Sequence, residues 1–141
     1  MALHDFSEEV VQYNIKKRFC EMESIYTQIG APILIALNPF RSMPIFNRGF
    51  AQKVKDYSAQ KRGLQASSGE PIENPGPHLF MVAEDTIQQL LREEQNQSII
   101  ITGDSGAGKT EAAKILLAYI AQANIRDFEG DLSEELHVPG P

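Results

Sequence analysis

The fold is decided by the stretch Gly103-Asp104-Ser105-Gly106-Ala107-Gly108-Lys109-Thr110, which fits the spacing G-x-x-x-x-G-K-[ST]. Residues 98–101, with three consecutive isoleucines, precede it and predict a buried parallel strand, and residues 111–123 predict a helix after it. The glycines allow a tight curl in which successive backbone N–H groups converge at the positive end of that helix. The stretch therefore predicts a phosphate-binding loop, with a nucleoside triphosphate as its ligand.

Five side chains in and beside this loop have separate predicted roles. Lys109 supplies a compact ammonium for the β- and γ-phosphates, and the Thr110 hydroxyl is placed to ligate a phosphate-bound Mg²⁺. Ser105 can point its hydroxyl at the terminal phosphate. Asp104 and Glu111 are expected to orient the loop or the helix rather than to abstract a proton. The alternative is a glycine-rich turn that binds nothing, but such a turn would have to meet all the constraints of spacing, strand and helix by chance.

Around the loop, residues 92–111 closely resemble the myosin motor domain. Three further segments agree with this family: residues 25–40, 43–46 and 77–85. The resemblance runs from about Val10 to Ala123 in the family's order. It implies an α/β, P-loop NTPase-like fold in which residues 1–141 form a partial motor domain. The central sheet would be incomplete, because further parallel strands should flank the strand before the loop and the chain ends before it could supply them.

The resemblance also implies an adenine and ribose site at Asn38, Pro39, Arg41 and Phe46. By themselves these residues would indicate only a turn that ends a strand. Two positions depart from the family's usual sequence. Asp104 replaces a glutamate, which shortens the carboxylate by one methylene. Phe46 replaces the tyrosine of many members, which keeps the ring but removes a hydroxyl able to hydrogen-bond the base.

The function implied by the resemblance is that of an ATP-binding segment of an actin-based motor, with ATP and Mg²⁺ as cofactors. The family's two other nucleotide motifs, Asn-x-Asn-Ser-Ser-Arg and Asp-x-x-Gly-Phe-Glu, do not occur in the sequence. We therefore expect this chain alone to be inactive as an ATPase, and the regions for actin filaments and light chains to lie beyond Pro141. One alternative is a stand-alone nucleotide-binding or regulatory fragment without motor activity. A weaker one is a small phosphate-loop kinase.

Composition excludes several other classes of function. A net charge of −6 argues against nucleic-acid binding, and the basic cluster Lys16-Lys17-Arg18 is expected to be a solvated helix face. No stretch approaches the roughly 20 apolar residues of a membrane span, and no secretory signal is visible at the N-terminus. The single cysteine, Cys20, is expected to be a buried structural thiol. A cytoplasmic compartment fits these features, and the resemblance implies association with the cytoskeleton.

Sequence patterns also place the remaining elements. Helices are expected over residues 8–20, 49–57 and 77–94, with strands over 26–29 and 32–37, the second of them buried. His78 is expected to begin a helix and to hydrogen-bond the backbone. Residues 56–77 are predicted to be a surface loop, and the acidic residues 124–141 a flexible tail that is cut within a loop.

Overall fold

The structure is a computed structural model that describes residues 7–63 and 71–125. These residues form two compact units, which meet in the sequence at the bond between Phe40 and Arg41. The predicted acidic tail from residue 126 onward and the middle of the predicted surface loop lie outside the described residues.

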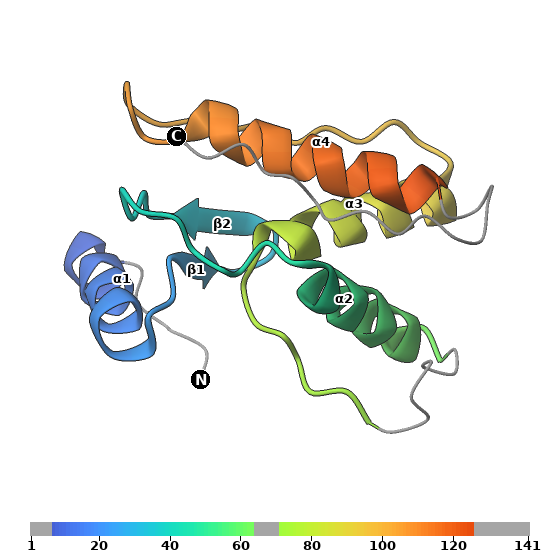
Figure 1. Cartoon of the computed structure of the whole chain (residues 1–141), viewed down its shortest axis with the longest axis horizontal. Helices are drawn as coiled ribbons and strands as arrows, with labels where there is room; N and C mark the ends of the chain where they lie inside the picture. The colour runs from blue at the N-terminus through green and yellow to red at the C-terminus, as the bar shows by residue number, and fades with distance from the viewer. Residues whose placement is uncertain (1–6, 64–70, 126–141) are drawn as a thin grey trace. The chain divides into compact units, whose positions relative to one another are not determined.

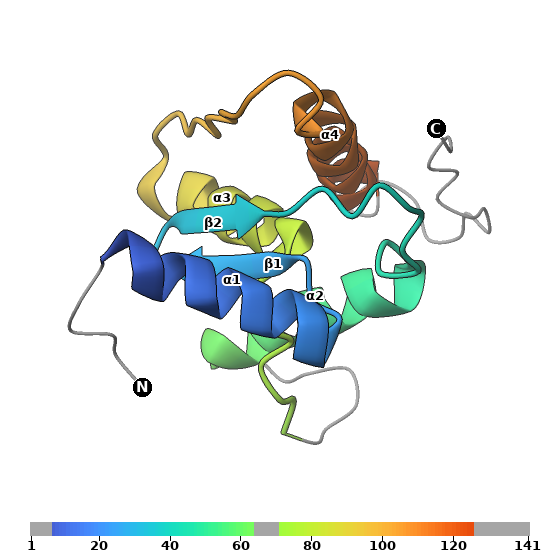
Figure 2. The ribbon, with the colours of Figure 1, turned by 90° about the vertical axis from the view of Figure 1, so that its left-hand side faces the viewer.

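The first unit consists of a helix and a hairpin. Helix α1 (Glu8–Met22) is followed by strands β1 (Tyr26–Ile29) and β2 (Ile33–Ala36). The strands pair antiparallel, with Tyr26 opposite Ala36. Gly30, with a φ of 58°, begins the turn between them, a conformation that glycine adopts without a steric cost. Figure 2 shows α1 running alongside β1, and the two elements are in contact.

Three predictions for this unit need correction. Helix α1 extends beyond Cys20, and that thiol is exposed rather than buried, because no residue of α1 is buried at all. Strand β2 is partly exposed, whereas the apolar run predicted a buried strand. The basic cluster is not wholly solvated: Arg18 is half-buried and its Nε donates to the Tyr26 carbonyl at 2.7 Å. This bond connects α1 to β1.

The second unit contains three helices, α2 (Arg48–Lys61), α3 (Leu79–Glu93) and α4 (Lys109–Ile125). Helix α3 lies between the other two and packs against both, as Figure 1 shows. The side chain of Asn47 caps α2 by accepting from the Phe50 backbone N–H at 2.9 Å. Helix α3 ends where Glu94 adopts a left-handed conformation, with a φ of 52°.

Apolar side chains from all three helices form the core of this unit. The buried ones on α2 and α3 are Ala51, Val54, Leu79, Phe80 and Ala83, and those on α4 are Ile115, Leu116 and Tyr119. On each helix they recur at helical spacing, so α2 and α4 each turn one apolar face toward α3. The buried face of α4 is narrower than its sequence predicts, since Leu117 is 65% exposed.

The strand predicted over residues 98–101 is absent. These residues have no regular secondary structure, and Ile100 is 88% exposed. A strand exists only when a neighbouring strand pairs with its N–H and C=O groups. Within the described residues the only paired strands are β1 and β2. The run of isoleucines therefore has the composition of a buried strand without the partner that would make it one.

Two helix boundaries also differ from the predictions. Helix α2 runs to Lys61, so the loop expected from residue 56 begins about two turns later. Pro77 precedes the capping residue of α3 instead of lying in its first turn. No helix within residues 7–63 and 71–125 has the combined length and apolar character that crossing a bilayer requires.

Candidate functional site

The candidate phosphate loop, residues 103–110, connects an extended segment to the N-terminus of α4. Gly106 and Gly108 have φ values of 76° and 92°, a region in which a side chain is strained. The Ala107 N–H donates to the Asp104 carbonyl at 3.2 Å, which closes a turn within the loop. The first turn of α4 begins at Lys109, where helix N–H groups lack acceptors within the helix. Backbone N–H groups at a helix N-terminus are suited to binding anions.

Lys109 holds the two ends of this loop together. Its Nζ donates to the carbonyls of Gly103 at 2.8 Å and of Asp104 at 2.7 Å. These bonds place the ammonium inside the curve of the loop. An ammonium has three N–H donors, so the two bonds leave a third for a ligand.

The other predicted loop side chains lie at the surface. Asp104, Ser105 and Thr110 are exposed, and Thr110 is the second residue of α4. Glu111 pairs with Lys114 at 2.8 Å, one turn along the helix, with both side chains about half exposed. A pair of this kind contributes little to stability, but it directs Glu111 along α4 and away from the loop.

The predicted adenine residues divide between the two units. Asn38 and Pro39 end the first unit, where the Asn38 side chain accepts from the Phe40 N–H at 2.9 Å in a tight turn. Arg41 and Phe46 begin the second unit, and Arg41 is exposed. Phe46 is half-buried, with its ring centroid 5.5 Å from that of His78. One side of the Phe46 ring is thus engaged by the protein.

His78 behaves as its sequence position predicts. It is the capping residue of α3, and its Nδ1 accepts from the Phe80 N–H at 3.0 Å. Burial lowers the pKa of His78 to about 4, while a hydrogen bond with the Ile45 backbone acts in the opposite direction. The imidazole is therefore neutral and structural at neutral pH.

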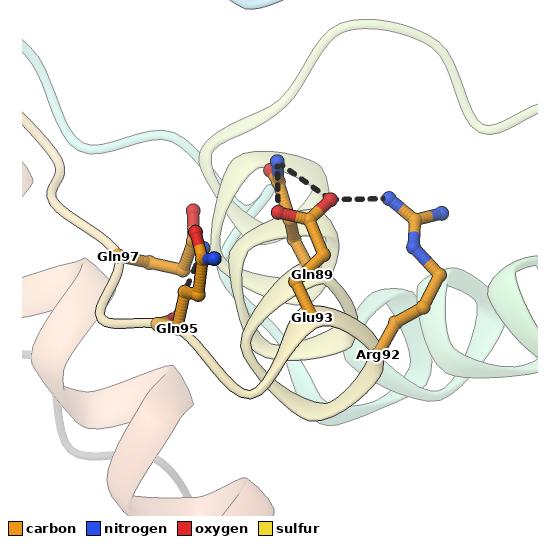
Figure 3. A network of polar contacts seen from close by, with 5 residues as sticks. All are labelled: Gln89, Arg92, Glu93, Gln95 and Gln97. Carbon is orange, nitrogen blue, oxygen red and sulfur yellow. Dashed lines mark hydrogen bonds and ion pairs between the residues drawn. The ribbon is translucent and has the colours of Figure 1, made fainter.

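Figure 3 shows polar contacts at the end of α3 and at the start of the connection that leads to the loop. The Glu93 carboxylate accepts from Gln89 at 3.2 Å and from Arg92 at 3.0 Å, and Gln97 donates to the Gln95 carbonyl at 3.1 Å. Four of these residues are exposed, Gln97 is half-buried, and solvent-exposed contacts of this type contribute little energy. These contacts join residues at most four apart in the chain, so they contribute little to the position of the loop.

Sequence reasoning missed a buried polar pair that connects α4 to α3. The Tyr119 hydroxyl donates to Glu84 Oε2 at 2.8 Å, and Gln88 Nε2 donates to Glu84 Oε1 at 2.8 Å. Glu84 is only 4% exposed and Tyr119 only 1%. A signal was present: Glu84 lies one turn after Phe80, within the apolar face of α3, where a carboxylate needs a partner.

With the geometry established, comparisons with known proteins identify the family. The sequence model described as myosin head (motor domain) matches residues 1–136. The chain belongs to this family. The myosin-head sequence is 35% identical to unconventional myosin-Va from Gallus gallus and 36% identical to unconventional myosin-Vb from Homo sapiens, in each case over 140 residues and 99% of the chain. It is 39% identical to Myosin-3 from Arabidopsis thaliana over 121 residues, or 86% of the chain.

The chain spans only a small part of these relatives. It covers 7% of the length of the two unconventional myosins and 9% of the length of the plant myosin. The predicted resemblance to the myosin motor domain is confirmed.

Proposed function

We propose that this myosin-head chain is the ATP-binding segment of an actin-based motor and that its fold is of the P-loop NTPase type. The observation that supports this most directly is the loop before α4, which curls through three positive-φ glycines and encloses the ammonium of Lys109. A glycine-rich turn without a ligand has no need of a cation at its centre. A loop that holds a triphosphate does, because the phosphate charge must be offset.

The donors in the loop fit a Mg-triphosphate. In this proposal the backbone of residues 103–108 holds the phosphates, and Lys109 donates its third N–H to a phosphate oxygen while it keeps the loop closed. Thr110, exposed in the first turn of α4, offers a hydroxyl to Mg²⁺, and Ser105 offers one to the terminal phosphate. The bound Mg²⁺ would offset the charge of the triphosphate.

The base and ribose would lie on Asn38, Pro39, Arg41 and Phe46. Phe46 supports this role because its ring is half-buried, which leaves part of it available for stacking. In the intact motor, hydrolysis of ATP would be coupled to movement on actin filaments, in a cytoplasmic, cytoskeleton-associated complex that can include light chains. The relatives named as myosins support this motor function.

The proposal is tested by measuring the affinity of the chain for Mg-ATP by calorimetry. Lys109→Ala should weaken binding at least about tenfold, because it removes the charge that offsets the phosphates. Lys114→Ala is the matched control, since it removes the same charge from the same helix but from a side chain paired with Glu111. Equal affinities for Lys109→Ala and the parent chain would contradict the proposed nucleotide site.

A further inference from the structure

The Glu84 carboxylate joins α4 to α3 through a directed interaction. It accepts from the Tyr119 hydroxyl of α4 and from the Gln88 amide of α3, both at 2.8 Å. Gln88 in turn accepts from Arg62 at the end of α2. The network therefore crosses all three helices of the second unit.

Burying a carboxylate is costly unless its oxygens are hydrogen-bonded. Here each oxygen has a donor, and the Tyr119 ring packs against Phe80 with a centroid distance of 4.8 Å and lies 5.9 Å from Lys55 Nζ. The pair is therefore fully enclosed by the unit. Such an arrangement adds little net stability compared with an apolar pair, but it fixes which atoms must meet.

The apolar contacts of α4 constrain its position in a different way. Ile115 and Leu116 are buried by apolar packing, which is close but does not specify which polar atoms meet. The polar contacts of Figure 3 join residues at most four apart in the chain and do not reach α4. The directed bond at Tyr119 adds a specific constraint on the rotation and the axial position of α4.

We propose that Glu84 is a positioning residue for the phosphate loop and acts through the Tyr119 hydroxyl. Lys109 and Tyr119 are separated by ten residues of one helix, about 15 Å along its axis, so a shift at Tyr119 is carried to the loop by a rigid element. The proposal rests on the proposed nucleotide-binding function. It assigns to a buried pair outside the loop the task of keeping the loop aligned with the phosphates.

Three variants separate this role from a contribution to stability alone. Tyr119→Phe removes the donor and keeps the ring, whereas Glu84→Leu removes the acceptor at similar volume. Glu84→Gln keeps an oxygen and an amide that can pair with the Tyr119 hydroxyl, so the directed contact survives without the charge. The double variant Tyr119→Phe/Glu84→Leu removes the unpaired buried carboxylate and should regain stability without regaining the directed contact.

Two measurements are made on each variant, at a temperature where circular dichroism shows it to be fully folded. One is the affinity for Mg-ATP. The other is the position of the Gly106 and Gly108 amide signals in a nitrogen–proton correlation spectrum without nucleotide, which reports the loop itself. The matched controls are Tyr13→Phe, which removes a hydroxyl from an exposed tyrosine of α1, and Gln89→Ala, which removes an exposed contact of α3.

Tyr119→Phe, Glu84→Leu and the double variant should each move the two glycine signals and weaken Mg-ATP binding about five- to tenfold. Glu84→Gln and the two controls should stay within about twofold of the parent chain. Unmoved glycine signals in Tyr119→Phe, or a double variant that regains affinity together with stability, would overturn the positioning role. If the parent chain fails to bind Mg-ATP, the proposed function fails, and the glycine signals alone decide the positioning role.

Discussion

The Nδ1 atom of His78 accepts a hydrogen bond from the backbone N–H of Phe80 at 3.0 Å. An imidazole nitrogen accepts only when it carries no proton, so this bond holds the ring in its neutral form with the proton on Nε2. The ring is buried and packs against Phe50, with centroids 4.5 Å apart. Both features oppose protonation of His78 in the folded protein.

We therefore predict that acid weakens the fold through His78. Its pKa is lowered from 6.5 to about 4, so between these values the unfolded chain binds a proton that the folded chain does not. The free energy of unfolding should fall as pH falls through this window, by up to about 3 kcal/mol from this residue. Urea unfolding at a series of pH values measures the effect.

The control for this prediction is His78→Asn. Asparagine can cap α3 with its side-chain oxygen but does not titrate. Its unfolding free energy should vary less between pH 6.5 and 4 than that of the parent chain. An equal slope for the two proteins would show that other groups, and not His78, cause the acid sensitivity.

Phe80 is predicted to be the most costly aromatic side chain to truncate. It is 2% exposed and lies within aromatic contact distance of Phe46, Phe50 and Tyr119. Phe80→Ala should lower the free energy of unfolding by about 3–5 kcal/mol, because it leaves a cavity among these rings. Phe40→Ala is the control, because Phe40 is 88% exposed. It should change the free energy of unfolding by less than about 0.5 kcal/mol. Chemical denaturation of both variants checks the difference.

Arg18 is predicted to stabilise the first unit. Its Nε donates to the Tyr26 carbonyl at 2.7 Å, and a hydrogen bond from a charged donor contributes about 1.5–3 kcal/mol. Arg18→Ala should therefore increase amide hydrogen exchange in β1, while Lys17→Ala, at the neighbouring exposed position, should leave it unchanged. Similar exchange in the two variants would show that this bond does not hold α1 on β1.

Phe46 offers a test of the proposed adenine site. Phe46→Tyr adds a hydroxyl that can hydrogen-bond the base, so binding should shift toward ATP over GTP by about 0.5–1.5 kcal/mol. Phe50→Tyr places the same hydroxyl on another ring that contacts His78, and it should not change the ratio. An unchanged ratio of the two affinities in Phe46→Tyr would show that this ring does not face the base.

Local sequence signals determined much of this protein. Helices α1, α3 and α4 and the β1–β2 hairpin follow from apolar spacing and from Gly30, and the His78 cap was expected from its position. The family also followed from sequence, because the loop and its flanking residues form a long and specific motif. These features depend on interactions between residues that are near in the chain, which is why pattern alone could predict them.

Tertiary structure decided what depends on distant partners. Residues 98–101 have the composition of a strand, yet they form none in the described part of the chain, because pairing requires a second strand. Cys20 is exposed, although its apolar neighbours predicted burial, since α1 has no buried residue among those that the structure describes. The Glu84–Tyr119 bond joins residues 35 positions apart, and no local pattern specifies which buried donor meets a buried acceptor. Packing of α3 against α4 brings these two atoms together, so the tertiary structure determines which buried donor meets which acceptor.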